Sequence, residues 1–272
     1  MTAGPLISAA ELLRTLPEVS VLDVRYRTGG HAGPEAFAEG HVPGAAYVDL
    51  DRDLAGPPGA GGRHPLPARD DFVAAMRRAG VSGARPVVVY DDWSGHAAGR
   101  AWWLLRHHGH PDVRVLDGAW PAWRAAGGAV ETGTPAVPPG DFEPGEPLVD
   151  VVEVGDVPAV AVLVDARAPE RFRGETEPLD PVAGHVPGAV NVPTSRNLAD
   201  DGRFRSAEEL AATYAAVGAV RGADVAAYCG SGVTATHDVL AMEVAGIRAR
   251  LYAGSWSGWI TDPARPVERS AD

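Results

Sequence analysis

Short apolar runs alternate with helix-like segments along the chain. Four of these runs have the length of a strand and few polar positions: 19–24, 86–90, 160–165 and 224–228. Ser206 with Glu209 three positions later is a capping-box pattern, which predicts a helix over 206–214. Residues 233–244 predict another helix, which follows a strand. This alternation predicts an α/β fold with mainly parallel sheets that helices flank on both faces.

The chain also contains an internal repeat. Four pairs of matched residues recur in one order: Asp23 and Asp165, His41 and His185, Tyr90 and Tyr228, Trp120 and Trp256. Their separations, 136–144 residues, are nearly constant, which indicates two tandem copies of one domain. Residues 132–147 contain five prolines and three glycines, a composition that disfavours helices and central strands. The predicted organisation is a first domain over 1–131, a linker over 132–147 and a second domain over 148–272.

Composition narrows the possible functions. The formal charge of −12 makes nucleic acid a poor partner, because phosphate would be repelled. All 24 basic residues are arginine, so Schiff-base and phosphate-loop chemistry, which require lysine, are excluded. The sequence has no long apolar run and no basic start leading into an apolar block, so we expect a cytoplasmic protein without a membrane segment. A single cysteine excludes internal disulfides and multi-thiolate metal sites.

That cysteine, Cys229, follows directly after the strand predicted to end at Tyr228. Gly230 and Gly232 allow the next residues to curl so that backbone N–H groups converge, and the following helix directs its positive end to the same place. Such surroundings favour a thiolate and would also hold a persulfide anion. We therefore expect an ionised thiol that is open to solvent. The alternative is a buried structural cysteine.

A cysteine loop of this shape also occurs in cysteine phosphatases. Their chemistry needs an arginine six positions after the cysteine to clamp the phosphate, and here that position is Ala235. The phosphatase interpretation therefore fails at one residue.

Together these motifs resemble those of the tandem rhodanese family. The resemblance rests on the paired Asp-x-Arg and Gly-His-x-Pro-Gly-Ala blocks, the Cys-Gly-Ser-Gly-Val-Thr loop and the Gly-Ser-Trp near the end, and it covers nearly the whole chain. It implies two tandem rhodanese-like domains and a sulfurtransferase whose cysteine carries sulfur as a persulfide. The first domain should be catalytically silent, because Asp91 occupies the place of Cys229.

The residues after the cysteine bear on the sulfur donor. Gly230 and Ser231 resemble those of mercaptopyruvate sulfurtransferases, whereas thiosulfate sulfurtransferases typically carry basic residues there. Fewer cations suit a donor with one carboxylate, so we expect 3-mercaptopyruvate, with thiosulfate as the alternative.

The resemblance also implies roles for particular residues. Arg171 matches the arginine that binds the donor carboxylate, a role that suits its planar fork. Ser231, His64 and Asp51 resemble the serine, histidine and aspartate of a relay that begins at the cysteine.

One position departs from the family pattern. Mercaptopyruvate enzymes usually carry a second arginine after the Glu-Pro that follows the first, but Leu179 and Asp180 come after Glu177-Pro178 here. Arg173 is the candidate to replace it. The loop residues expected to contact the sulfur donor are Gly230, Gly232, Val233 and Thr234.

The expected reaction is a two-step transfer with no metal or organic cofactor. The Cys229 thiolate takes sulfur from the donor, and a thiol or cyanide then removes it. A thioredoxin-like protein is one candidate thiol acceptor. The rival from another class is a non-catalytic binding module on the same scaffold, and retention of Cys229 favours the enzyme.

Overall fold

The protein, described by a computed structural model over residues 4–26 and 33–270, forms two compact units. The first unit comprises the chain through Gly56, Pro67–Leu148 and Asp200–Phe204. The second comprises Pro57–Leu66, Val149–Ala199 and the chain from Arg205 onward. The short segment Pro57–Leu66 therefore belongs to the second unit although the chain on either side of it belongs to the first.

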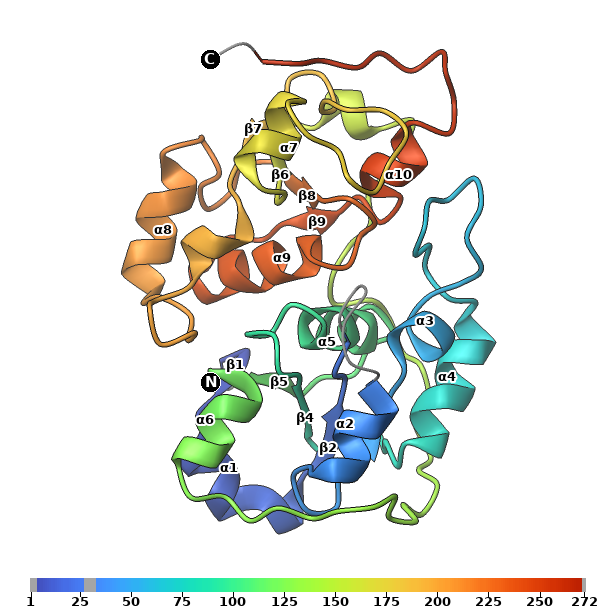
Figure 1. The fold of residues 1–272 in the computed structure, drawn as a ribbon, viewed down its shortest axis with the longest axis vertical. Helices are drawn as coiled ribbons and strands as arrows, with labels where there is room; N and C mark the ends of the chain where they lie inside the picture. Colours follow the sequence, from blue (N-terminus) through green and yellow to red (C-terminus); the bar gives the residue numbers. More distant parts are fainter. Residues whose placement is uncertain (1–3, 27–32, 271–272) are drawn as a thin grey trace. The chain divides into compact units, whose positions relative to one another are not determined.

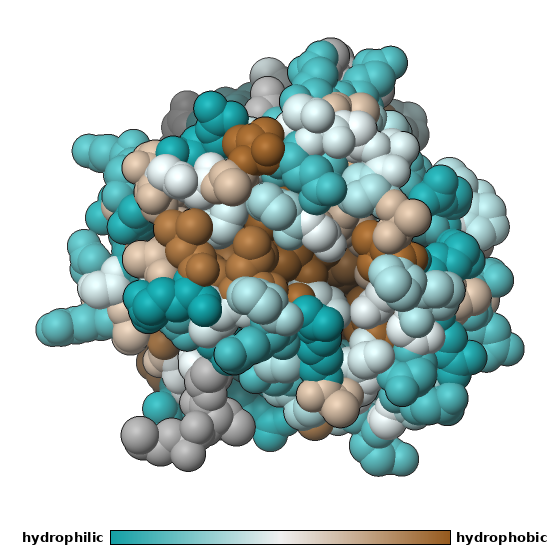
Figure 2. Space-filling view, turned by 90° about the horizontal axis from the view of Figure 1, so that it is seen from below, coloured by the Kyte–Doolittle hydropathy of each residue, from teal (hydrophilic) through white to brown (hydrophobic). Residues whose placement is uncertain are grey.

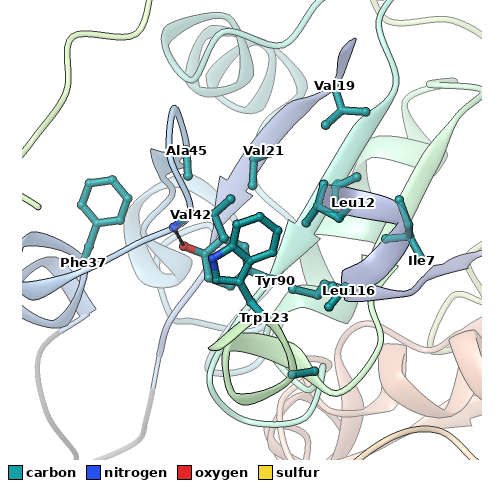
Figure 3. Close-up of a cluster of buried hydrophobic side chains, with 13 residues drawn as sticks. Ile7, Leu12, Val19, Val21, Phe37, Val42, Ala45, Tyr90, Leu116 and Trp123 are labelled. Carbon is teal, nitrogen blue, oxygen red and sulfur yellow. Dashed lines mark hydrogen bonds between the residues drawn. The ribbon is translucent and has the colours of Figure 1, made fainter. Parts of the chain in front are cut away.

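The first unit is built around a five-stranded sheet in the order β1-β5-β4-β2-β3, in which every described pairing is parallel. Its elements are β1 Leu6–Ile7, α1 Ala9–Thr15, η1 Leu16–Glu18, β2 Ser20–Asp23, α2 Gly33–Glu39, β3 Ala46–Tyr47, α3 Leu50–Asp53, α4 Arg69–Arg78, β4 Val87–Tyr90, α5 Ala98–His107, β5 Val113–Leu116 and α6 Ala119–Ala125. Apolar side chains from the sheet, α1 and α6 form a core that includes Tyr90 and Trp123 (Figure 3).

The second unit repeats this plan with a four-stranded parallel sheet in the order β7-β6-β8-β9. Its elements are η2 Val157–Ala159, β6 Val162–Asp165, α7 Pro169–Arg173, β7 Val190–Asn191, η3 Thr194–Asn197, α8 Ala207–Ala215, β8 Val225–Tyr228, α9 Ala235–Val244, β9 Arg250–Leu251 and α10 Ser255–Trp259. Within this unit α9 lies on one side of the strands and α7 and α10 on the other (Figure 1). The predicted α/β class with parallel sheets between helices is confirmed.

The repeated motifs meet in one buried network in each unit. In the second unit, Nη2 of Arg167 donates to Asp165 at 2.6 Å and to the carbonyl of Gly184 at 2.7 Å, and its guanidinium lies 4.9 Å from the ring centre of Trp256. The hydroxyl of Tyr228 accepts the N–H of Val186 at 3.1 Å. The buried charge is thus paired and hydrogen-bonded, as burial requires.

The first unit has the same network. Arg25 binds Asp23 at 2.6 Å and the carbonyl of Gly40 at 2.7 Å, and its guanidinium lies 5.2 Å from the ring centre of Trp120. Tyr90 accepts the N–H of Val42 at 3.1 Å, the hydrogen bond drawn in Figure 3. Aspartate, arginine, tyrosine and tryptophan therefore recur in the sequence because they build one motif twice.

The predicted capping box is confirmed: the side chain of Ser206 accepts the N–H of Glu209, whose carboxylate accepts the N–H of Ser206. The helix expected over 233–244 begins at Ala235, so Val233 and Thr234 belong to the preceding loop.

Figure 2 shows one face, on which apolar side chains gather in a central hollow with hydrophilic residues around it. Within residues 4–26 and 33–270, no helix has the length and hydrophobicity needed to cross a membrane.

Candidate active site

The loop between β8 and α9 holds Cys229 through its backbone. The N–H of Cys229 donates to Oγ of Ser255 at 3.0 Å, and the carbonyl of Cys229 accepts the N–H of Trp256 at 2.9 Å. Ser255 has a φ of 52°, in the left-handed region that non-glycine residues rarely adopt. The repeated Gly-Ser-Trp motif therefore fixes the backbone on which the thiol is carried.

The Cys229 thiol is buried, whereas the sequence led us to expect a thiol open to solvent. Cys229 is 2 % exposed, because the helix and the loop around Ser255 close over the strand end. Its surroundings are nevertheless polar: the N–H of Gly232 donates to Sγ at 3.2 Å. In the described part of the chain, the N–H groups of Gly230, Ser231 and Thr234 have no acceptor. A buried thiol beside unused donors differs from a structural cysteine in an apolar core.

The matching loop of the first unit explains what these donors can bind. Asp91 follows β4 as Cys229 follows β8, and its carboxylate is completely buried. One carboxylate oxygen accepts the N–H groups of Trp93 and Gly95, both at 2.9 Å. The other accepts those of Ala97 and Ala98, at 2.8 and 2.9 Å. A loop of this kind at the start of a helix thus surrounds an anion with four amides.

Position 232 accepts only glycine. Its φ is 79°, and a Cβ atom there would lie 2.2 Å from the carbonyl oxygen of Ala253. Val233 is buried, and its carbonyl accepts the N–H of Thr236 at 3.2 Å, which starts α9.

His64 lies beside the cysteine loop, as predicted: its Nδ1 is 2.8 Å from Oγ of Ser231. The segment Pro57–Leu66 carries it, and Ser257 anchors that segment by accepting the N–H of Arg63 at 3.0 Å. Gly62 has a φ of 99°, and a Cβ there would lie 2.7 Å from the carbonyl oxygen of Gly254, so only glycine allows this close approach.

Asp51 lies on α3 of the first unit, in a different unit from His64. Its role in a relay with His64 therefore stays a prediction.

Arg171 lies in an ion-pair network beside the loop. Its Nη2 donates to Glu177 at 2.6 Å, and Glu177 also contacts Arg167 at 3.3 Å. Burial would raise the pKa of Glu177, but hydrogen bonds from Arg171 and the N–H of Leu179 outweigh it and lower that pKa. Burial raises the pKa of Asp180, which lies 3.6 Å from Arg171, and the nearby Glu177 adds to this shift.

Arg63 lies at the site although the sequence did not predict it there. Its guanidinium forms an ion pair with Asp180 and also approaches the cysteine loop. A Cβ atom on Gly230 would lie 3.0 Å from Nη2 of Arg63 and 3.6 Å from Nη1 of Arg171. Two arginines therefore approach the residue after the thiol, the expected Arg171 and the unexpected Arg63, although neither follows it directly in the sequence. The one available signal was that Arg63 precedes His64.

Arg173, predicted to substitute for the family's second arginine, forms an ion pair with Glu175. Its role in donor binding stays a prediction.

A buried carboxylate lies on the helix that follows the loop. Asp238 on α9 accepts a hydrogen bond from Asn197 at 2.7 Å, and Asn197 accepts one from Tyr214 at 2.9 Å. No cation pairs with Asp238 in the described residues, and burial raises its pKa well above the usual range. The same residues contain no cluster of histidine, cysteine, aspartate or glutamate that could hold a metal ion.

Comparison with known proteins gives the family. The family model of the rhodanese-like domain matches residues 8–126 and again 152–262. A Mycobacterium tuberculosis relative described as the thiosulfate sulfurtransferase SseB is 46 % identical, over 97 % of this chain and 96 % of its own. A Pseudomonas aeruginosa relative described as a 3-mercaptopyruvate sulfurtransferase is 45 % identical, over 98 % and 99 %.

Solved structures agree with this assignment. The 3-mercaptopyruvate sulfurtransferase from Leishmania major superimposes with a TM-score of 0.87 at 31 % identity, covering 96 % of this chain and 76 % of that one. The two matched segments contain the two repeated networks and the loops at Asp91 and Cys229. The chain therefore belongs to the rhodanese family, with two tandem copies of the rhodanese-like domain.

Proposed function

We propose that this chain is a sulfurtransferase in which Cys229 takes sulfur from 3-mercaptopyruvate and passes it to a thiol or to cyanide. The observation that carries the proposal is the pair of matching loops. In the first, four amides bind the two carboxylate oxygens of Asp91. In the second, the N–H of Gly232 donates to Sγ of Cys229, and the N–H groups of Gly230, Ser231 and Thr234 have no acceptor among the described residues. The outer sulfur of a persulfide is two bonds from Cβ, as each oxygen of Asp91 is, so it would meet the same donors.

The first step forms an S–S bond and breaks a C–S bond. The Cys229 thiolate attacks the donor sulfur, and the electron pair of the broken bond passes to the donor carbon, which takes a proton and leaves as pyruvate. We assign that proton transfer to Ser231 and His64, which lie 2.8 Å apart. In the second step, a thiol or cyanide attacks the outer sulfur and restores the Cys229 thiolate.

The donor carboxylate is assigned to Arg171. Glu177 accepts hydrogen bonds from Nε and Nη2, whereas Nη1 has no hydrogen-bond partner in the described residues. A Cβ on Gly230 would lie 3.4 Å from Nη2 and 3.6 Å from Nη1. The proposed sulfur acceptor is a thiol, such as one on a thioredoxin-like protein. The proposed location is the cytoplasm.

Thiosulfate is the second candidate donor. Two observations favour it: the relative described as SseB, and the two guanidinium groups beside Gly230, which would suit a doubly charged anion.

Intact mass after incubation with each donor tests the proposal. We expect the parent protein to gain about 32 Da, the mass of one sulfur atom, with 3-mercaptopyruvate, and to lose it on addition of cyanide. Cys229→Ser should gain nothing. A gain with thiosulfate alone would change the donor, and an unchanged parent mass with both donors would leave a binding module as the function.

A further inference from the structure

A cavity of about 220 Å³ lies within the second unit, beside the segment that holds the cysteine loop. Three stretches of chain contribute to its wall: part of Pro57–Leu66, residues 151–154, and residues 252–254 before α10. Arg265 from the C-terminal segment also lines it. Neither the cysteine loop nor Arg171 does, so the cavity is separate from the place where sulfur is transferred.

Tyr252 brings an unused hydroxyl to this wall. The residue is only 3 % exposed, and its ring centre lies 6.5 Å from those of Tyr228 and Trp259. Its hydroxyl has no hydrogen-bond partner among the described residues, whereas the hydroxyl of a buried tyrosine usually has one. Burial raises the pKa of Tyr252 to about 12, so the hydroxyl keeps its proton at neutral pH and can donate it to a ligand.

Arg265 brings a positive charge to the same wall. Its Nη1 donates to the carbonyls of Gly258 and Trp259, at 2.8 and 3.0 Å, which fixes the guanidinium at the end of α10. Its Nε lies 3.8 Å from Asp262. Nη2 has no partner in the part of the chain that the structure describes. The charge of Arg265 opposes the effect of burial on the pKa of Tyr252, so the guanidinium acts on that hydroxyl.

The rest of the wall is mainly apolar. Pro65, Leu66 and Val152 are among the residues that form it. Glu153 is the one acidic residue of the wall, and its charge adds to the raised pKa of Tyr252. A ligand with a second carboxylate would therefore be repelled. The cavity is smaller than the pockets of about 300–1,000 Å³ that hold drug-sized molecules, so its ligand has to be small.

We propose that this cavity is a second ligand site, which binds a small aliphatic monocarboxylate. The carboxylate accepts hydrogen bonds from the hydroxyl of Tyr252 and from Nη2 of Arg265, and the hydrocarbon part packs against the apolar wall. One residue links the site to the reactive cysteine: Oγ of Ser255 donates to the carbonyl of Tyr252 and accepts the N–H of Cys229, both at 3.0 Å. The site is distinct from the binding of the sulfur donor and does not depend on the proposed function.

The test is an NMR chemical-shift titration of the whole ¹⁵N-labelled chain with 4-methylpentanoate. We expect saturable shifts at the amides of Gly61 and Gly254, which line the cavity. Tyr252→Phe should weaken binding about 5- to 10-fold without lowering the unfolding temperature, because the hydroxyl that it removes has no partner among the described residues. Arg265→Gln should weaken binding about 10- to 100-fold, the usual effect of a lost charged hydrogen bond.

Two controls make the test specific. Arg269→Gln removes another arginine of the C-terminal segment, one that donates to the carbonyl of Ala183, and it should leave binding unchanged. The amine 4-methylpentylamine, which has the same hydrocarbon part, should not bind. Because Arg265 also caps α10, Tyr252→Phe decides the question if Arg265→Gln fails to fold. The absence of saturable shifts or an unchanged dissociation constant in Tyr252→Phe would overturn the proposal. Weakening by Arg171→Gln alone would do the same, because it would place the probe in the donor site.

Discussion

Three buried carboxylates lie close to the cysteine loop or on the helix after it, and their surroundings shift their pKa values differently. Glu177 receives hydrogen bonds from Arg171 and from backbone N–H groups, which lower its pKa despite burial. Asp180 has Arg63 as a partner, yet burial keeps its pKa raised. Burial dominates at Asp238 and raises its pKa well above the usual range, although hydrogen bonds with Asn197 and Tyr214 oppose the shift. A cation partner alone therefore does not decide the direction of the shift, because the pKa of Asp180 is raised beside Arg63, whereas Arg171 together with backbone N–H donors lowers the pKa of Glu177.

Asp238→Asn should make stability less dependent on pH. In the unfolded chain Asp238 ionises near pH ~3.9, whereas in the folded protein it stays protonated well above that pH. The folded state then binds more protons, so the free energy of unfolding falls as pH rises, by about 1.4 kcal/mol for each pH unit within that window. Asparagine keeps the shape and does not titrate, so the variant's unfolding temperature should exceed the parent's increasingly from pH 4 toward pH 7.

The measurement is the unfolding temperature of parent and variant across that pH range. Asp262→Asn, which removes an exposed carboxylate of the same unit, should show the parent's pH dependence. A difference between Asp238→Asn and the parent that does not change with pH would show that Asp238 is charged in the folded protein.

Single residues of the site differed in how far the sequence could predict them. Cys229 followed from the strand, the glycines and the helix in one local stretch, and the role of Ser231 followed from the family resemblance. Arg63 did not, because its importance comes from an ion pair with Asp180, 117 residues away, and from proximity to Gly230. Neither contact leaves a periodic pattern. The enclosure of Cys229 was also missed, because it depends on how the segment after β9 covers the loop.

At the scale of elements, the site is built from short strands that end together and from the loops after them. β6 and β8 pair in parallel, with Asp165 opposite Tyr228, so the arginine network and the cysteine loop begin at the same edge. The first turn of α10 then holds the loop through hydrogen bonds from Trp256 and to Ser255. Alternation of strands and helices predicted these elements well, because each strand is a short apolar run. It did not predict the start of α9, which the glycines delay to Ala235.

Gly232→Ala should disrupt the loop more than a glycine substitution elsewhere. Alanine at this φ is strained, and its Cβ would meet the carbonyl of Ala253 at 2.2 Å, so the N–H that binds the thiol has to move. We expect a loss of about 2–4 kcal/mol of unfolding free energy, together with slower sulfur loading. Urea unfolding and timed intact-mass measurements check the two effects.

Gly222→Ala is the matched control. Gly222 has a similar φ of 86°, but a Cβ there meets nothing within 4 Å. It should therefore lose only the strain of about 1 kcal/mol and load sulfur normally. Equal losses in the two variants would show that the contact with Ala253 is unimportant.

At the scale of the whole molecule, two copies of one domain have kept their buried networks while their loops have diverged. The repeat was predictable because each network needs the same aspartate, arginine, tyrosine and tryptophan. The assignment of Pro57–Leu66 to the second unit was not predictable, because this segment has no regular element and is held by contacts with Ser257 and Ser231. Its sequence position suggested only a lengthened loop in the first copy.

His64→Ala should therefore affect chemistry carried out 165 residues further along the chain. Removing the imidazole that contacts Ser231 should slow pyruvate release about 100-fold, the usual contribution of a positioned proton donor, with little change in donor affinity. Single-turnover kinetics separate the two quantities.

A double-mutant cycle makes this test specific. If His64 and Ser231 act as one unit, His64→Ala, Ser231→Ala and the double variant should be slowed to a similar extent. Additive losses would mean that the two side chains act independently, and an unchanged rate in His64→Ala would remove it from the reaction.

The loops at Asp91 and Cys229 also differ in how long the bound group stays in place. A sulfur atom arrives at Cys229 and departs in every cycle, whereas the carboxylate of Asp91 is part of the chain and its four amide bonds persist. The loop of the first copy is thus always in the anion-bound state. Any change observed around residues 91–98 during turnover must originate elsewhere in the molecule, because the anion in that loop never leaves.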